Sequence, residues 1–246
     1  MMNQLFQKDK NTSVREHPLS LNSAMVQAVL DGRKTQTRLI VKMTDFGKPA
    51  PGPCNHTQRV FESDGKFYQQ DCFIPPCALP ILGPRHEISC PYGIPGDRLW
   101  VRETWCELRV GHFNELGLPR DLLVTRYDDP RRNGAAYRAN CSAEGEEIRA
   151  SYGYRWKPSI HMPRWASRLT LEIVNVRVER LHDLSEADAL DEGCDINLLP
   201  DGAGEGGEFT CPTEWFMNLW NTKYGSKAWD DNPWVWVIDF KRTEDE

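Results

Sequence analysis

Nine prolines between positions 49 and 95 constrain the fold of this 246-residue chain more than any other feature. They stand at positions 49, 51, 53, 75, 76, 80, 84, 91 and 95. Proline has no backbone N–H and clashes with the preceding turn of a helix, so the stretch excludes long helices. It favours loops and short hairpins instead. We interpret residues 43–95 as an insertion in a fold that is more regular on either side.

Cysteines and histidines in the same insertion raise the question of a metal site. They are Cys54, His56, Cys72, Cys77, His86 and Cys90. A segment with little core of its own gains stability from a zinc ion, but these residues include no CxxC pair and fit no standard zinc spacing. We predict no metal and no cofactor, and the four cysteines are the candidate ligands should zinc bind. The other interpretation is that they are reduced, half-buried thiols.

Composition narrows the class of protein. Hydrophobic residues make up 39% of the chain and charged residues 27%, which indicates a globular fold. No apolar run approaches the roughly 18 residues of a membrane span, and the N-terminus lacks the apolar stretch of a signal peptide. We therefore expect no membrane partner and a cytoplasmic location. The net charge of −6 argues against indiscriminate coating of nucleic acid, although a local basic surface is compatible with it.

A compact basic turn follows the first predicted helix. The helix spans residues 24–30, with Ser23 as its N-cap and Gly32 in the left-handed conformation that ends it. If the chain then runs extended, side chains alternate between two faces, and Lys34 and Thr37 point to opposite faces. A turn at Lys34 brings the two together instead. The sequence leaves both geometries open.

Strands are also expected outside the insertion, beginning at Leu39 and near Tyr137, and alternation of apolar and polar residues predicts the clearest ones. They lie at residues 99–102, 169–180 and 234–240. In the second of these, the alternation slips by one position after Ile173, which predicts a β-bulge.

Two further helices are predicted in the last third of the chain. The first lies at residues 184–193, where Ser185 is the N-cap, acidic residues fill the first turn and Gly193 ends the helix. The second begins at Thr213, and the period of its aromatic residues places them in the core.

The chain is predicted to form one domain over residues 19–242. Residues 1–18 are polar and precede it as a flexible N-terminus. Within the domain, residues 43–95 are the insertion and residues 107–168 are an extended loop region.

Two carboxylates stand at the ends of predicted elements. Glu103 follows a strand and is either a site residue or the ion-pair partner of Arg102. Glu192 lies in the last turn of a helix, where the helix dipole disfavours a negative charge. A residue that opposes its local preference can be held there by function, and the alternative is that Glu192 is simply exposed to solvent.

Residues 149–168 interleave basic and aromatic side chains and contain no aspartate or glutamate. The basic residues are Arg149, Arg155, Lys157, His161, Arg164 and Arg168, and the aromatic ones are Tyr152, Tyr154, Trp156 and Trp165. Cationic groups hold phosphates and flat rings stack on bases, so the segment favours binding of RNA or single-stranded DNA. The alternative is a surface loop whose tryptophans point inward and whose arginines are merely solvated.

The order of these motifs resembles that of a known family. The chain carries "GRKTQT", "PGDRLWVRETW", "RWKPSIHMPRWASR", "LSEADALDEG" and "NPWVWVI" in succession. It resembles the ASCH domain, a small β-barrel of the PUA-like superfamily tied to RNA and modified-base metabolism. It is most similar to the larger ASCH proteins carried by phages and prophages, over about residues 20–242. The resemblance implies an α+β fold, a PUA-like barrel with peripheral helices and a Pro/Cys-rich insertion.

The resemblance also implies catalytic residues. Small bacterial ASCH enzymes that hydrolyse N4-acetylcytidine carry a Lys-x-x-Thr pair after the first helix and a glutamate near the end of a later one. These positions fall on Lys34, Thr37 and Glu192. The residues that we predict to bind substrate or nucleic acid follow from their charge and aromatic character and not from the resemblance, and they are Arg33, Arg38, Arg155, Trp156, Lys157, His161 and Arg164. This chain is more than twice as long as those enzymes, which suggests a larger or polymeric ligand.

Three chemical roles for the catalytic residues stay open. Thr37 can act as a nucleophile if Lys34, which loses its proton more readily among neighbouring arginines, activates it. Glu192 can instead activate a water that attacks an amide carbonyl, with Lys34 stabilising the oxyanion. Neither scheme needs a metal. The same residues can also simply bind a base, so the alternative to an amidohydrolase is a non-catalytic module that binds RNA or single-stranded DNA.

Overall fold

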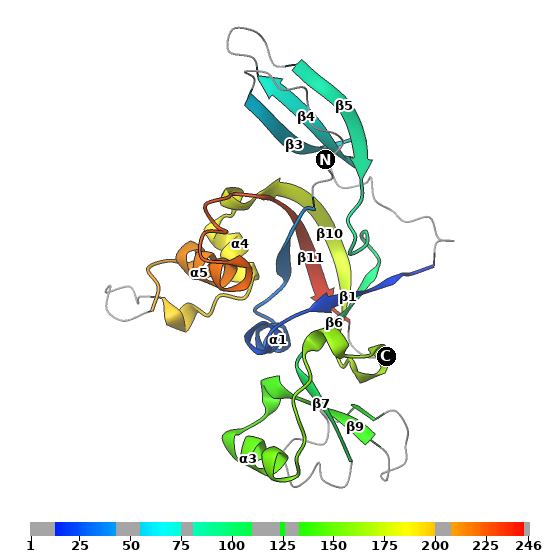
Figure 1. Cartoon of the computed structure of the whole chain (residues 1–246), viewed down its shortest axis with the longest axis vertical. Coiled ribbons are helices and arrows are strands. Elements are labelled where there is room, and N and C mark those ends of the chain that lie inside the picture. The colour runs from blue at the N-terminus through cyan, green and yellow to red at the C-terminus, as the bar shows by residue number, and fades with distance from the viewer. Residues whose placement is uncertain are drawn as a thin grey trace. The chain divides into compact units, whose positions relative to one another are not determined.

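The computed structural model divides into two compact units. It describes residues 13–42, 55–74, 81–109, 124–125, 133–199 and 208–243. Unit 1 comprises Gln36–Pro95 and Val174–Asp239, and unit 2 comprises Ser13–Thr35, Gly96–Ile173 and Phe240–Glu246 (Figure 1). The single domain over residues 19–242 stays a prediction.

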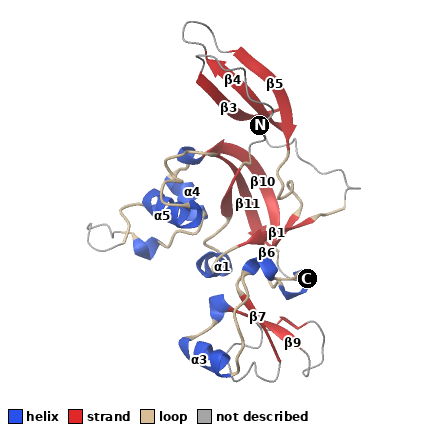
Figure 2. Ribbon diagram, in the orientation of Figure 1, coloured by secondary structure: helices blue, strands red, loops and turns tan. Residues whose placement is uncertain are grey.

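Strands dominate the described chain (Figure 2). They are β1 (Glu16–Ser20), β2 (Gln36–Ile40), β3 (Asn55–Ser63), β4 (Lys66–Ile74), β5 (Ile81–Ile88), β6 (Arg98–Arg102), β7 (Trp105–Arg109), β8 (Val124–Thr125), β9 (Asn133–Tyr137), β10 (Thr170–Arg180) and β11 (Trp234–Arg242). The α-helices are α1 (Ser23–Leu30), α3 (Ala143–Ser151), α4 (Glu186–Asp191) and α5 (Pro212–Tyr224). In the described ranges, no helix combines the length and the apolar character needed to cross a lipid bilayer.

The longest run of paired strands has the order β1-β6-β10-β11-β2. β1 is parallel to β6, whereas the pairs β6–β10 and β2–β11 are antiparallel. β10 is one continuous strand whose residues up to Ile173 belong to unit 2 and whose remaining residues belong to unit 1. The described strands close no barrel. The predicted α+β class is confirmed.

In unit 1, α4 and α5 pack on one face of β11. The buried cluster between them consists of Leu181, Leu184, Ala189, Phe216, Trp220, Val235 and Val237. Phe216 and Trp220 therefore belong to the core, as predicted. The predicted ends of α4 are also confirmed, because Ser185 caps the helix and Gly193 follows it with a φ of 102°. The N-cap of α5 is Cys211 and not Thr213, since Pro212 already fits the first helical position.

The insertion folds into an antiparallel sheet in the order β3-β4-β5. The predicted hairpins are confirmed, but their strands of eight or nine residues are longer than the short hairpins that we predicted. Asp64 and Gly65 form the first turn with positive φ. Pro84 lies in the edge strand β5, next to a register shift against β4, where a missing N–H breaks no regular ladder. The sheet contacts β11, since the Phe67 and Trp236 rings meet edge to face at 4.9 Å.

Unit 2 contains more regular structure than predicted. The region predicted as an extended loop carries the β7-β9-β8 sheet and helix α3, which begins at the N-cap Ser142. β1 likewise extends into the N-terminus that we predicted as flexible. Leu19 is the one side chain that β1 buries. The strand is therefore held by its backbone pairing with β6, and the sequence of β1 carries no apolar alternation that could have predicted it. Residues 1–12 lie outside the described residues.

The predicted long strand at residues 169–180 is confirmed as β10, although its buried side chains differ in part from the predicted ones. Ile173 is buried as predicted, but Val174 is 53% exposed and Asn175 is exposed as well. Burial resumes at Val176. The alternation therefore breaks after Ile173, as predicted, but by two successive exposed residues, which leaves Val174 outside the core.

This burial pattern predicts that alanine substitutions at two neighbouring positions of β10 lower the free energy of unfolding by different amounts. Ile173→Ala removes a fully buried side chain and should lower the free energy of unfolding by about 2–5 kcal/mol. Val174→Ala truncates an exposed side chain and should change it by less than about 1 kcal/mol. Urea unfolding of the two variants measures both values, and equal losses would contradict the register.

Candidate functional site

The basic turn after α1 leaves the helix as extended chain. α1 is capped by Asn22, whose side chain accepts from the N–H of Met25, and not by Ser23. Gly32 has a φ of 75°, which confirms the left-handed end of the helix. The N–H of Lys34 then donates to the carbonyl of Ala28 at 2.9 Å, and β2 begins at Gln36.

Strand geometry fixes which way the β2 side chains point. Successive residues alternate, so Gln36 and Arg38 lie on one face and Thr37 on the other. The cross-strand neighbour of Arg38 is Val237, which packs with α4 and α5, and that of Thr37 is Ile238. Arg38 therefore faces the helices.

Arg38 is the centre of a buried set of charges in unit 1. Its side chain is 0% exposed. Nη2 lies 2.5 Å from Glu179 and 3.5 Å from Asp188, and Nη1 lies 3.4 Å from Glu192. Gln36 also accepts from Nη1. Its Nε is buried and has no hydrogen-bond partner in the described part of the chain.

A second arginine extends this set along β10. Arg177 lies 2.8 Å from Asp188, 3.0 Å from Asp239 and 3.2 Å from Glu179. We call the resulting group the buried charge network after its three buried members, Gln36, Arg38 and Glu192. Its other members are partly exposed, and they are Arg177, Glu179, Asp188 and Asp239. It holds two cations against four carboxylates, so it suits a ligand group that donates hydrogen bonds or carries positive charge.

The charges of the network shift the pKa of its member Asp188 and of Tyr224 on the neighbouring helix α5. Burial disfavours ionisation of Asp188, but hydrogen bonds from Ser185 and Gln36 and the charge of Arg38 outweigh it and lower the pKa of Asp188 to about 2. Burial, together with the negative charge of Glu192, raises the pKa of Tyr224 to about 12. Glu192 therefore acts electrostatically on α5 as well as on Arg38.

The three predicted catalytic residues occupy different environments. Glu192 is 2% exposed at the C-cap of α4, so the alternative interpretation, in which it is simply exposed to solvent, is wrong. Thr37 is buried on the opposite face of β2 from the network, so the structure does not bring it to Glu192. Lys34 is 2% exposed and belongs to unit 2.

Most of the predicted substrate-binding cations are paired with carboxylates. The pairs are Arg33–Asp31 at 3.0 Å, Lys157–Glu107 at 3.1 Å and Arg164–Glu16 at 2.8 Å. Trp156 donates to Glu146, which also pairs with Arg149. Arg155 and His161 are exposed, and no described carboxylate forms an ion pair with either. The segment 149–168 is therefore less positive than its sequence suggests, because its counter-charges come from elsewhere in the chain.

Glu103 belongs to a second buried ion pair, in unit 2. It meets Arg168 through two hydrogen bonds of 2.8 and 2.9 Å, so its partner is not Arg102. Burial raises the pKa of Glu103 despite this guanidinium. Arg168 also bonds Asn140 at 2.6 Å and lies 4.1 Å from the Tyr137 ring centroid. The pair joins β6 to the segment before β10, which is a structural role.

The candidate zinc ligands are only partly within the described residues. Cys54 and Cys77 lie outside them. Cys72 is half-buried in β4, and Cys90 is buried, which raises the pKa of its thiol to about 11. Where the chain is described, no three His, Cys, Asp or Glu side chains gather to hold a metal.

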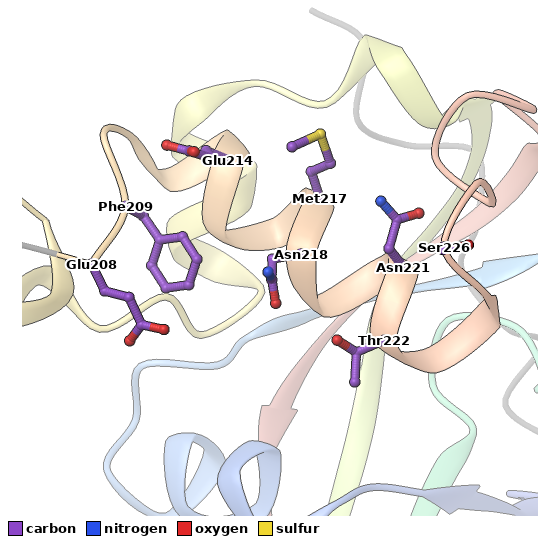
Figure 3. Close-up of a pocket in the computed structure, with 8 residues that line it drawn as sticks. All are labelled: Glu208, Phe209, Glu214, Met217, Asn218, Asn221, Thr222 and Ser226. Carbon is purple, nitrogen blue, oxygen red and sulfur yellow. The ribbon is translucent and has the colours of Figure 1, made fainter.

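A cavity of about 520 Å³ opens beside α5 (Figure 3). It is lined by α5 side chains such as Met217 and by Glu208 and Phe209 from the segment before the helix. Its second carboxylate, Glu214, accepts from the N–H and hydroxyl of Thr210. None of the predicted site residues lines this cavity, so it is separate from the predicted chemistry.

Comparison with known proteins gives no relative. The chain matches no protein-family model, no curated protein and no solved structure.

The buried charge network predicts a pH-dependent stability. An aspartate in an unfolded chain has a pKa of about 4. In the folded protein the pKa of Asp188 is lower, at about 2. Its stabilising effect is therefore complete above about pH 4 and is lost as the pH falls through about 2. Asp188→Asn should lower the free energy of unfolding by about 1–3 kcal/mol at pH 6.

The difference between wild type and Asp188→Asn should shrink as the pH falls from about 4 toward 2, in urea unfolding at each pH. The matched control is Asp191→Asn on the same helix, an exposed carboxylate that should cost less than about 0.5 kcal/mol at pH 6. A difference that stays constant with pH would contradict the assigned role of Asp188.

Proposed function

We propose that this chain is an ASCH-type amidohydrolase that removes the acyl group from N4-acetylcytidine or a similar modified base. The order of the sequence motifs supports a relation to the PUA-like ASCH proteins of phages and prophages. The observation that carries the proposal is the burial of Glu192 beside Arg38. Carboxylates are almost never fully buried unless they are paired or used, and Glu192 is held at a helix end that disfavours its charge.

Lys34 supports the same proposal independently. A lysine in a turn is ordinarily solvated, yet this side chain is 2% exposed. Burial of an amine is costly, so a buried lysine marks a place where the fold uses its charge or its hydrogen bonds. The sequence motif therefore gives two buried ionisable residues, Lys34 and Glu192, at the positions where ASCH enzymes carry their catalytic lysine and glutamate.

Of the two hydrolytic schemes, the strand geometry favours a Glu192-activated water. Thr37 is buried on the face of β2 opposite to the network, away from the carboxylate that the helix end holds inside the protein, so we assign the activation of the nucleophile to Glu192 and not to the Lys34–Thr37 pair. In the proposed reaction, Glu192 takes a proton from water and the resulting hydroxide attacks the acyl carbon. The bond from that carbon to N4 of cytosine then breaks, and N4 receives the proton. The products are a carboxylic acid and the free exocyclic amine. For Lys34, which the sequence motif and not the structure assigns to the site, the proposed role is to stabilise the oxyanion in between.

The carboxylate-rich network supports a cytosine-like substrate, because an exocyclic amine donates hydrogen bonds. Glu192 can accept from such an N–H in the bound base. The alternative function, a non-catalytic module that binds RNA or single-stranded DNA, uses the same acceptor without turnover.

Turnover of N4-acetylcytidine tests the proposal. The purified 246-residue chain should release cytidine from N4-acetylcytidine, and chromatography measures the cytidine formed. Glu192→Gln and Lys34→Met should each lower kcat/KM by at least about 100-fold, because each removes a group that acts in the transition state. Thr37→Val should retain activity within about tenfold, since its hydroxyl takes no part.

The control for this experiment is Asp191→Asn, which alters the carboxylate next to Glu192 and should retain full activity. Circular dichroism shows whether each variant is folded. No turnover by the wild type, or turnover that survives both Glu192→Gln and Lys34→Met in folded protein, would overturn the proposal. Loss of activity in Thr37→Val alone would reinstate threonine as the nucleophile.

A further inference from the structure

The β3–β5 sheet of unit 1 has two unlike faces. Its register places Val60, Gln69 and Asp71 on one face, and these are buried. Phe67 on the same face meets Trp236 of β11. The indole N–H of Trp234 also donates to the carbonyl of Gln58 at 3.2 Å. This face is therefore the one that packs against the rest of unit 1.

The opposite face carries aromatic rings between cations. The register places Arg59, Phe61, Lys66, Tyr68, Gln70, Arg85 and Glu87 on it. We call this set the platform face. The Phe61 and Tyr68 rings are stacked, with centroids 5.8 Å apart and planes 28° from parallel. Both rings are only half-buried.

Two arginines flank Phe61 on this face. The guanidinium carbons of Arg59 and Arg85 lie 4.9 and 5.3 Å from the Phe61 ring centroid. Arg59 is held by Gln70 through bonds of 3.1 and 2.5 Å, and Gln70 donates onward to Gly83 at 2.6 Å. Arg59 is thus held by hydrogen bonds that connect all three strands, which reduces the conformational entropy that binding would cost at this side chain.

The charge on the platform face is unbalanced. Arg59 and Arg85 are exposed, and no described carboxylate pairs with either. Lys66 pairs with Glu87 at 2.8 Å, and both are more than half exposed. In a chain of net charge −6, this face therefore presents three cations and one carboxylate. The cations of segment 149–168, by contrast, are mostly neutralised.

We propose that the platform face binds single-stranded nucleic acid. Bases stack on Tyr68, Phe61 and the guanidinium planes, and the backbone phosphates lie against Arg85 and Lys66. Rings exposed on the open face of a sheet suit unpaired bases, because a duplex keeps its bases stacked on one another. The binding is independent of the proposed hydrolysis, since it requires neither Glu192 nor an acylated base.

The test is fluorescence anisotropy of the full chain with labelled oligothymidylate and oligouridylate of about 12 nucleotides, over a series of salt concentrations. Arg85→Gln should reduce the slope of log K against log salt by about 0.7, the value for one phosphate contact on a single strand. Phe61→Leu keeps the apolar volume but removes the ring, and it should weaken Kd by about tenfold. A duplex of the same length should bind more weakly than either single strand.

The matched control is Arg242→Gln, which makes the same charge change on an exposed arginine of unit 2 and should leave both values unchanged. Arg155→Gln tests the rival surface in segment 149–168 and should also leave them unchanged. Glu192→Gln should bind as the wild type does, so failure of the hydrolase proposal leaves this result intact. The proposal is overturned if Arg85→Gln and Phe61→Leu bind as the wild type does, if Arg155→Gln alone reduces the slope, or if the duplex binds as tightly as the single strands.

Discussion

The guanidinium of Arg38 is the interaction on which the interior of unit 1 depends. It is fully buried and faces carboxylates from β10 and α4, namely Glu179, Asp188 and Glu192. Removing one member of a buried ion pair costs about 3–5 kcal/mol, because the remaining charge is left without compensation. These contacts therefore hold the short helix α4 against the sheet in a fixed position.

The same constraint connects stability to the proposed chemistry. The network holds more carboxylates than cations, and the hydrogen bonds of Gln36 and Ser185 are needed to keep Asp188 ionised. A site of this kind is prepared to accept hydrogen bonds from a ligand and costs little reorganisation when one binds. The Thr37 hydroxyl is excluded from it by the period of a β-strand alone. The position of a residue along β2 therefore decides whether its side chain can reach the network.

Charge pairing across the fold also changes where nucleic acid would bind. Segment 149–168 contains no acidic residue, yet Glu16, Glu107 and Glu146 pair with its lysine and arginines. The β3–β5 sheet shows the opposite outcome, since its arginines stack on an aromatic ring and keep their charge available. A basic run in a sequence measures local charge, whereas a ligand responds to the charge left after folding.

The sequence by itself determined the features that depend on neighbours along the chain. These are the α+β class, the glycine end of α1, the Ser185 cap of α4, the β10 and β11 strands and the hairpins of the proline-rich insertion. Only the tertiary structure decided what lies far apart in sequence. Arg38 and Glu192 are 154 residues apart, and Glu103 pairs with Arg168 instead of the adjacent Arg102. Caps and alternation are set by local sterics and hydrogen bonds, but a buried charge is set by whichever opposite charge the fold brings to it.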